Sequence, residues 1–236
     1  MNKNAIDFDK GFLSQQLMGP NCIRHIDEIT QKIRLTPEMR ILDLGCGNGL
    51  TSMYLAKKYG SQVFAADLWI DPTDNFERFK QFGLDAQIVP VRAEAHELPF
   101  AKNYFDAVVS VDAYHYFGAE PDYLDKHLAP LVKRGGIIAI SVPGLLAEFP
   151  DEIPDILQPY VKKEFHFHSV AWWKSHWQHS EKVEMIDAFS LKCHKDAWED
   201  WLQTENPYAV DDRPMMVAEG GNYFDTVGVI AKVTAE

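Results

Sequence analysis

The sequence predicts an α/β protein with a Rossmann-like, mostly parallel seven-stranded sheet, helices on both faces, an antiparallel hairpin at one edge, and a helical, aromatic lid. Three observations predict this fold. Short apolar runs alternate with helical patterns along the chain, as in repeated β-α-β units. A glycine-rich turn, residues 45–49, directly follows the first apolar run. The chain has 236 residues, of which 46% are hydrophobic, so it can bury one substantial core.

The first elements are predicted around the glycine-rich turn. Residues 40–44 form a short, mainly apolar run, which predicts a buried strand. Residues 50–59 have helical periodicity and stop at Gly60, a residue type that commonly ends helices. A second strand is predicted at 62–67. The Asp71-Pro72 pair then provides an N-cap and a first-turn proline for a helix through Phe82.

The remaining elements complete the sheet and define the parts of the chain. Strands are predicted at 85–91, 107–111 and 136–142, with a helix at 121–132 and a turn at Gly135-Gly136 before the last of these strands. Two alternating segments, 183–191 and 223–233, predict the antiparallel hairpin. Residues 1–236 are expected to form a single domain. Its parts are an N-terminal helical cap at 1–36, a cofactor-binding core at 37–143, a lid insertion at 144–181 and closing strands at 182–236.

The composition argues against several classes of partner. The chain has 23 basic and 35 acidic residues, a formal net charge of -12, and no cluster of Lys or Arg, so a nucleic-acid backbone would be repelled. Its three cysteines are widely spaced and fit reduced thiols better than disulfides or a zinc site. The first ten residues lack an apolar signal region, and the longest apolar run is too short to span a membrane. We expect a cytoplasmic protein with no membrane or nucleic-acid partner, and a homodimer stays open.

Two acidic residues near the glycine-rich turn indicate the chemistry of the ligand. The turn has Leu50 where the third glycine of a dinucleotide-binding fingerprint would fall, and Asp43 would repel a pyrophosphate. A carboxylate suits S-adenosylmethionine instead, because this cofactor has an ammonium and a sulfonium. Asp67 ends the second strand about 20 residues beyond the turn, at the position that binds ribose hydroxyls in such folds.

Two further segments carry a family resemblance. Residues 93–100, AEAHELPF, and 104–117, YFDAVVSVDAYHYF, resemble the adenine-binding motif and the motif after the fourth strand of class I S-adenosylmethionine-dependent methyltransferases. The likeness is to the small-molecule, methyltransferase type 11-like branch, and it spans about residues 38–143. It implies that S-adenosylmethionine binds beyond the carboxyl ends of the strands and that the chain methylates a small-molecule acceptor.

Eleven residues are predicted to bind the cofactor. Asp43 is expected beside its ammonium and Asp67 beside its ribose. Glu94 and the Ala95 backbone are expected at the edge of the adenine ring. The full set, which includes two apolar side chains that would sandwich the ring, is Asp43, Gly45, Cys46, Gly47, Asn48, Asp67, Leu68, Trp69, Glu94, Ala95 and Asp112.

His115 and Asp112 are the candidate catalytic residues. Methyl transfer requires a nucleophile in line with the methyl group and, for an alcohol, phenol or ammonium, the removal of a proton. His115 is the first candidate for this base, because the ordinary pKa of histidine is near neutrality. The alternative for His115 is a buried ring that hydrogen-bonds to the backbone, since many such enzymes act by proximity alone.

Aromatic residues indicate the substrate side. Residues 144–181 are rich in aromatic and histidine side chains, which suits an apolar pocket with few polar contacts. The i, i+4 spacing of Trp173 and Trp177 is also typical of an ordinary core helix. No metal is predicted, because the His176-x-x-His179 pair has no third ligand at a convincing spacing. The predicted substrate residues are Tyr114, Tyr116, Trp172, Trp173 and Trp177.

Two alternatives to a methyltransferase stay open. A non-catalytic module that binds S-adenosylmethionine or S-adenosylhomocysteine would have the same turn but no substrate cavity. A nicotinamide-dependent oxidoreductase is disfavoured by Asp43 and by the missing third glycine.

Overall fold

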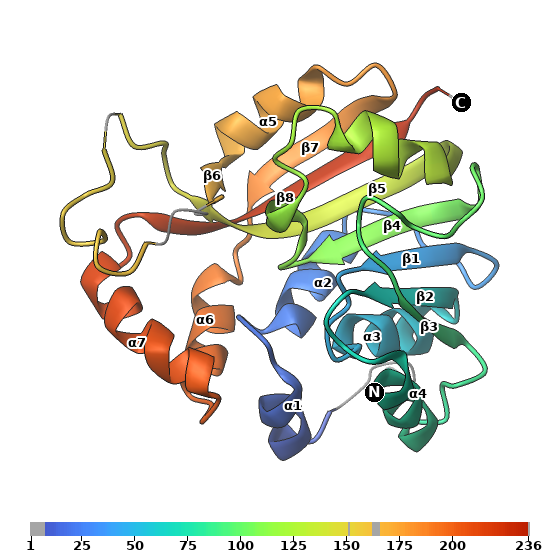
Figure 1. Ribbon diagram of the computed structural model, residues 1–236, viewed down its shortest axis with the longest axis horizontal. Helices are drawn as coiled ribbons and strands as arrows, with labels where there is room; N and C mark the ends of the chain where they lie inside the picture. The colour runs from blue at the N-terminus through green and yellow to red at the C-terminus, as the bar shows by residue number, and fades with distance from the viewer. Residues whose placement is uncertain (1–7, 151, 162–165, 236) are drawn as a thin grey trace.

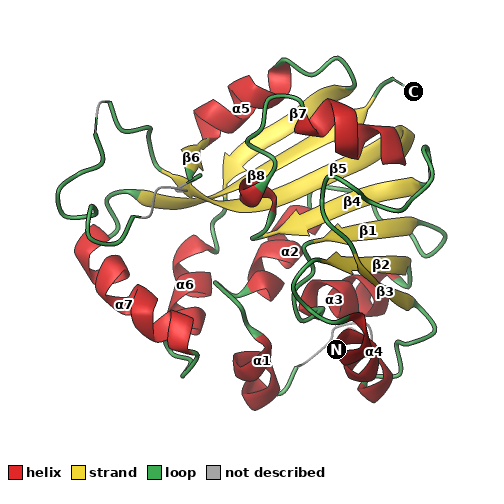
Figure 2. Ribbon diagram, viewed as in Figure 1, coloured by secondary structure: helices red, strands yellow, loops and turns green. Residues whose placement is uncertain are grey.

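One twisted sheet runs through the protein, which we describe from a computed structural model covering residues 8–150, 152–161 and 166–235. The strands follow the spatial order β3-β2-β1-β4-β5-β8-β7, and a short strand, β6, pairs with the end of β5. Strands β1 to β5 pair in parallel, whereas β8 is antiparallel to both of its neighbours (Figure 2). The strands are β1 Arg40–Leu44, β2 Gln62–Asp67, β3 Ile88–Arg92, β4 Phe105–Val111, β5 Val132–Leu145, β6 His168–Ser169, β7 Val183–Ser190 and β8 Phe224–Val233.

Helices cover both faces of this sheet. In Figure 1, α5 lies above the sheet, and α3, α4 and α6 lie below it. The α-helices are α1 Lys10–Gln16, α2 Cys22–Thr30, α3 Leu50–Tyr59, α4 Pro72–Gln81, α5 Val170–Gln178, α6 His194–Leu202 and α7 Pro207–Glu219. Three short irregular helices join β4 to β5: η1 Tyr114–Tyr116, η2 Leu124–Leu128 and η3 Ala129–Leu131.

The alternation of side chains along each strand divides the core into two layers. In β1, Ile41 packs with the α2 and α3 side, whereas Leu42 and Leu44 pack with the α5 side. Asp43 therefore points to the same face as Ile41, toward α3. This alternation decides toward which face of the sheet each side chain of β1 points.

Most of the predicted elements are confirmed. β1, β2 and α3 have the predicted bounds, and α4 begins after Asp71, which accepts a hydrogen bond from the Thr73 backbone N–H as an N-cap. The seven-stranded, mostly parallel sheet with helices on both faces is also confirmed. None of the described helices is long and apolar enough to cross a membrane.

Three elements between residues 85 and 142 differ from the prediction. β3 begins at Ile88, because residues 84–87 form a hydrogen-bonded turn. The predicted helix at 121–132 is a π-turn followed by a 3-10 turn, since Pro130 has no N–H to continue a regular helix. The Gly135-Gly136 turn lies within β5, where pairing with β4 is interrupted and resumes at Ile137.

The closing strands also differ in their connection. β7 and β8 are antiparallel neighbours as predicted, but α6 and α7 lie between them in the chain, so they are not a hairpin. β8 also inserts between β5 and β7. The two intervening helices pack on the same side as α2 and α3, where Trp198 and Trp201 enter the core.

Candidate cofactor-binding and active site

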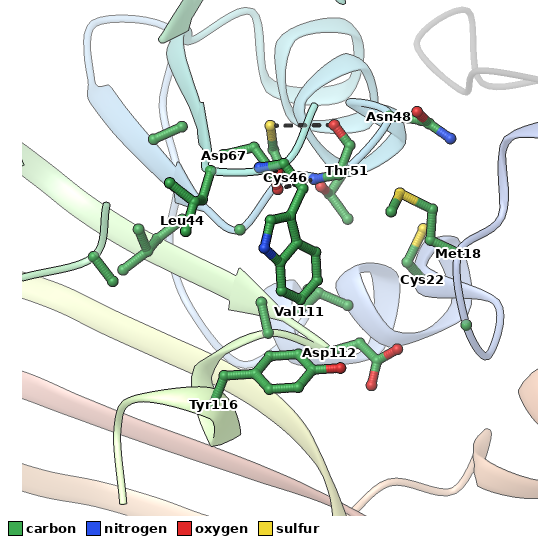
Figure 3. Close-up of a pocket in the computed structure, with 18 of the residues that line it drawn as sticks. Met18, Cys22, Leu44, Cys46, Asn48, Thr51, Asp67, Val111, Asp112 and Tyr116 are labelled. Atoms are coloured by element: carbon green, nitrogen blue, oxygen red, sulfur yellow. Dashed lines mark hydrogen bonds between the residues drawn. The ribbon is translucent and has the colours of Figure 1, made fainter. Parts of the chain in front are cut away.

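A cavity of about 290 Å³ lies beyond the carboxyl ends of β1, β2 and β4 (Figure 3). This is the position where open parallel sheets bind ligands, at the reversal of strand order. The described residues that line it fall within five segments: 16–22, 44–51, 66–69, 93–96 and 111–117. None comes from the predicted lid at 144–181, part of which lies outside the described residues.

The turn after β1 is fixed to the end of β2 by backbone hydrogen bonds. The N–H groups of Gly45 and Cys46 donate to the Ala66 carbonyl oxygen, at 2.8 and 3.1 Å. The N–H of Gly47 donates to Asp67 Oδ2 at 2.8 Å. The glycine-rich turn and the carboxylate at the end of β2 therefore form one unit, which joins two walls of the cavity.

A side chain at either of two glycines in this turn would crowd a neighbouring residue. Gly45 has a φ of 74°, and a Cβ there would lie 2.2 Å from the Cβ of Ala113. Gly47 has a φ of 52°, and its Cβ would lie 2.9 Å from Met18 Sδ. Both positions are in the left-handed region that favours glycine. The backbone itself thus forms this wall of the cavity.

Asp67 is a lining residue whose carboxylate is partly engaged. Asp67 is 8% exposed. Its Oδ1 accepts hydrogen bonds from the N–H groups of Trp69 and Ile70, at 2.8 and 3.0 Å. Oδ2 accepts only from Gly47 among the described residues. A carboxylate oxygen has about two acceptor sites. Oδ2 therefore keeps one for a ligand hydroxyl.

Asp43 does not line the cavity, which corrects the expectation that it meets a cofactor ammonium. It is fully buried, and its Oδ2 accepts hydrogen bonds from the Thr51 and Ser52 hydroxyls in the first turn of α3, both at 2.6 Å. Burial raises its pKa to about 6, although the two hydroxyls oppose the shift. The side chain points toward α3 because of the strand alternation in β1 and supports the start of that helix.

An acidic and aromatic wall lies on the β2–β3 side. Glu94 Oε1 lies 2.9 Å from His96 Nδ1, and the other ring nitrogen lies 3.1 Å from Glu120 Oε2. The hydrogen bond to His96 lowers the pKa of Glu94, and that bond raises the pKa of His96. Trp69, 66% exposed, meets Tyr116 edge to face with ring centroids 5.5 Å apart.

Asp112 stands at the opposite wall, directly after β4. Its φ of 57° is unusual for a residue other than glycine, although Asp tolerates it better than most. Its Oδ2 occupies the space beside Gly19, 2.2 Å from where a Cβ would lie. Burial, with a smaller contribution from the charge of Asp212, raises the pKa of Asp112 to about 7. Figure 3 shows Asp112 and Tyr116 together on one side of the cavity, facing Met18 and Cys22.

His115 lies behind this wall and is not a lining residue. It is buried, its Nδ1 has no hydrogen-bond partner among the described residues, and its ring packs near Tyr116 and Phe167. Burial lowers its pKa to about 3. The ring is therefore neutral near pH 7 and a weak base. It is buried, as in the alternative, but its Nδ1 does not make the expected hydrogen bond to the backbone within the described residues.

The structure separates most of the predicted substrate residues from the cavity. Tyr116 is a lining residue. Tyr114, Trp173 and Trp177 are instead buried together in the core on the α5 side of the sheet, with ring centroids 5.7 to 5.9 Å from Tyr114 to each tryptophan. Trp172 stacks on His168 at 3.7 Å, also outside the cavity. The i, i+4 spacing of the tryptophans marks a core helix, as the alternative held.

The cavity thus gathers all the predicted cofactor residues except Asp43. It also includes residues that the sequence reasoning did not assign, in the loop between α1 and α2. The signal for them is the Met18-Gly19-Pro20 sequence, whose glycine and proline mark a turn next to an exposed methionine. These additional lining residues are Gln16, Met18, Gly19, Pro20 and Cys22.

Comparison with known proteins agrees with this geometry. Residues 42–140 match the family model described as "Methyltransferase domain". The glycine/sarcosine/dimethylglycine N-methyltransferase of Actinopolyspora halophila is 30% identical over 116 residues, which are 49% of this chain and 20% of that protein. The chain therefore spans about a fifth of the length of this curated relative.

Solved structures share the fold over nearly the whole chain. Phosphoethanolamine N-methyltransferase 2 of Haemonchus contortus, solved with S-adenosyl-L-methionine, superposes with a TM-score of 0.74 at 17% identity, covering 93% of this chain and 54% of that one. The [4+2]-cyclase SpnF superposes with a TM-score of 0.70 at 14% identity, covering 100% and 89%. Since one of these two proteins is named as a cyclase, the likeness establishes the fold and not an activity.

The family match covers residues 42–140, and the shared fold extends over nearly the whole chain. This chain is thus similar to methyltransferase domains in that segment and has their Rossmann-like fold.

Proposed function

We propose that this protein is an S-adenosylmethionine-dependent methyltransferase that acts on a small-molecule acceptor. The charge of the cavity is the observation that supports this most directly. Its described lining includes the carboxylates of Asp67, Glu94 and Asp112 and contains no Lys or Arg. Such a lining suits a ligand with a sulfonium and an ammonium, and it would repel the pyrophosphate of a dinucleotide.

The residues present fit this cofactor. The bare backbone at Gly45 and Gly47 allows close approach, and Asp67 Oδ2 has an acceptor site for a ribose hydroxyl. Glu94 and the Ala95 backbone would meet the adenine edge, with Trp69 against the ring. When bound, the cofactor supplies an activated methyl group.

Asp112 is the candidate base for acceptors that must lose a proton. It reaches the cavity, whereas His115 lies behind the wall and is neutral. A pKa raised to about 7 suits proton transfer near neutral pH. Tyr116 and the 16–22 loop would enclose the acceptor beside it.

The relatives support a small-molecule acceptor. The names of those that match include N-methyltransferases of glycine and sarcosine and of phosphoethanolamine, and a sterol 24-C-methyltransferase. The acidic chain, with its net charge of -12, and its three unpaired cysteines are consistent with a cytoplasmic protein that does not bind nucleic acid. A homodimer stays open.

Calorimetric titration tests the proposed cofactor. S-Adenosylhomocysteine should bind the wild-type protein more tightly than NADH does. Asp67→Ala should weaken it by about 1.5–3 kcal/mol, or roughly 10- to 150-fold, as expected for charge-assisted hydrogen bonds. Asp74→Ala, which removes an exposed carboxylate in the first turn of α4, serves as the control.

The outcomes separate the hypotheses. Tighter binding of NADH would reject the cofactor, and an unchanged affinity in Asp67→Ala would reject the ribose assignment. Release of S-adenosylhomocysteine when S-adenosylmethionine is incubated with a metabolite pool would distinguish an enzyme from a non-catalytic module that only binds the cofactor.

A further inference from the structure

We infer that the acceptor is an amine without a carboxylate or phosphate group, and that it binds as an ammonium beside Asp112. This inference rests on the proposed function and adds the class of substrate. Three features of the described cavity support it. The lining has no free cation, the Asp112 carboxylate has no described hydrogen-bond donor or opposite charge, and aromatic rings lie next to that carboxylate.

The described lining offers no basic side chain that would hold an acidic acceptor beside Asp112. A carboxylate or phosphate in a partly buried site requires a cationic partner or several donors. No Lys or Arg is found among the described lining residues. His96 is the only side chain among them that can become a cation near neutral pH, and its two ring nitrogens already lie beside Glu94 and Glu120. An acidic acceptor beside Asp112 would meet a carboxylate that has no described cationic partner.

The Asp112 carboxylate is the group in this cavity that most requires a cation. No described group donates a hydrogen bond to it, and the charge that acts on it, from Asp212 of α7, has the same sign. Its left-handed backbone directs the side chain to the space beside Gly19, at the wall formed by the loop between α1 and α2. An ammonium at this place would supply the missing donors and the missing opposite charge.

Aromatic rings complete a surface suited to an alkylammonium. Tyr116 is 58% exposed and lies next to Asp112 in the cavity wall, with Trp69 edge to face against it. The faces of such rings attract ammonium groups and the methyl groups on them. Met18 and Cys22 add polarizable, uncharged surface opposite. Substituted amines would therefore be favoured over alcohols of the same shape.

The reaction balances with groups that the site contains. Asp112 takes one proton from the ammonium, which leaves a neutral amine with a free electron pair. The free electron pair of the amine nitrogen then forms a bond to the methyl carbon while the carbon–sulfur bond breaks. The electron pair of the broken bond stays on the sulfur of S-adenosylhomocysteine. The product is the N-methylated ammonium, and Asp112 returns its proton to solvent.

Three probes of nearly the same shape test the inference: 2-phenylethylamine, 2-phenylethanol and 3-phenylpropionate. Their binding to the protein saturated with S-adenosylhomocysteine is measured by ligand-observed NMR at pH 7.5. The amine should bind at least 10-fold more tightly than the acid. Asp112→Asn should reduce this preference at least 10-fold, and asparagine tolerates the left-handed backbone at that position. Asp122→Asn, an exposed carboxylate paired with Lys126, should leave the preference unchanged.

Two results would overturn the inference. One is wild-type protein that binds the acid as tightly as the amine. The other is an Asp112→Asn variant that saturates with S-adenosylhomocysteine yet keeps the full preference. Methylation of the acid or the alcohol faster than the amine would overturn it as well. Failure of S-adenosylhomocysteine to bind at all would instead reject the proposed function, so the two failures are distinguishable.

Discussion

At the scale of single residues, Asp112 combines two features that cost stability in the ligand-free protein. Its backbone is left-handed, and its carboxylate is enclosed with a like charge nearby. Strained or unfavourable groups of this kind persist at functional sites because the surrounding structure holds them in place. Asp112 is therefore expected to lower stability while it serves binding.

The pH dependence of stability measures this effect. A folded-state pKa of about 7, above the ordinary 3.8, means that ionisation of Asp112 opposes folding, so its unfavourable contribution grows as the pH rises from about 4 to about 7. Asp212 faces it from α7. Cys22 of α2 and Tyr116 of η1 also face it, but their raised pKa values keep them neutral in this range.

Asp112→Asn should consequently be more stable than the wild type at pH 8, by about 1 kcal/mol, because it has no charge to bury. Urea unfolding from pH 4 to pH 8 should show the advantage increasing up to pH 7 and then levelling. Asp122→Asn should show no such trend. An advantage for Asp112→Asn that is absent, or that shrinks as the pH rises, would contradict the raised pKa.

A pair of glycines separates the cost of backbone strain from the loss of a ligand contact. Gly47 and Gly83 both have positive φ, of 52° and 66°, but only Gly47 lies at the cavity, and a Cβ on Gly83 would meet nothing within 4 Å. Gly47→Ala and Gly83→Ala should both lose about 1 kcal/mol of unfolding free energy. Only Gly47→Ala should weaken S-adenosylhomocysteine, by about 10-fold or more. Equal affinities in the two variants would show that the turn does not touch the cofactor.

At the residue level, local spacing brings two of the predicted cofactor residues to the cavity. Asp67 is the last residue of β2, Glu94 lies two residues after β3, and both line the cavity. Asp43 is the next-to-last residue of the predicted strand at 40–44, and the period of two turns it toward α3. The hydroxyls of Thr51 and Ser52 were the signal for its role, because a buried carboxylate requires nearby donors.

At the scale of elements, α1 is a helix without buried residues, and it leads into the loop that lines the cavity. Its Phe12 packs on Phe82. The loop after it is anchored, because Leu17 is buried and the Asn21 N–H donates to the Ala197 carbonyl at 3.0 Å. An element with as few buried contacts as α1 opens most easily. Ligand binding against the loop should therefore hold the segment of α1 and this loop closed.

Limited trypsin digestion tests this closure. Saturating S-adenosylhomocysteine should slow cleavage after Lys10, in α1, severalfold, because cleavage there requires local opening. Cleavage after Lys174, an exposed residue of α5 remote from the cavity lining, should keep its rate. Equal protection at both sites would indicate a general gain in stability, and no protection at Lys10 would reject the closing role of the segment.

The elements that sequence reasoning missed had usable local signals. Asn206-Pro207 provides an N-cap and a first-turn proline for α7, and Gly220 ends it in a left-handed conformation. Pro214 inside the helix obscured this pattern. By contrast, the segments 183–191 and 223–233 were enough to predict both strands, although β8 is buried along nearly its whole length and does not alternate. Local patterns of this kind cannot indicate that α6 and α7 lie between β7 and β8 in the chain while the two strands pair in the sheet.

At the scale of the whole molecule, the order of the strands decides which parts of the chain reach the site. The lid was predicted from the aromatic residues of 144–181, but α5 packs on β7, and its buried tryptophans, Trp173 and Trp177, belong to the core of that face. The N-terminal segment supplies the cover instead. Sequence periodicity identifies a buried face of a helix, whereas the partner of that face depends on the three-dimensional arrangement.

The charge of the whole chain matches the chemistry of its cavity. A net charge of -12 attracts cations toward the molecule, and the acidic cavity would concentrate them at its mouth. Both the proposed cofactor and the inferred acceptor are cations near neutral pH. The overall acidic composition, from which no nucleic-acid partner is expected, is thus consistent with the ligands that the site itself favours.

A crystal structure of the protein with S-adenosylhomocysteine tests the central claim most directly. The account predicts the ligand in the cavity beyond β1, β2 and β4, with a ribose hydroxyl within hydrogen-bond distance of Asp67 Oδ2 and the sulfur on the side of Asp112 and Tyr116. A second ribose contact, to Oδ1, would require the Trp69 or Ile70 N–H to release it. Ligand density outside this cavity, or a ribose that does not contact Asp67, would contradict the account.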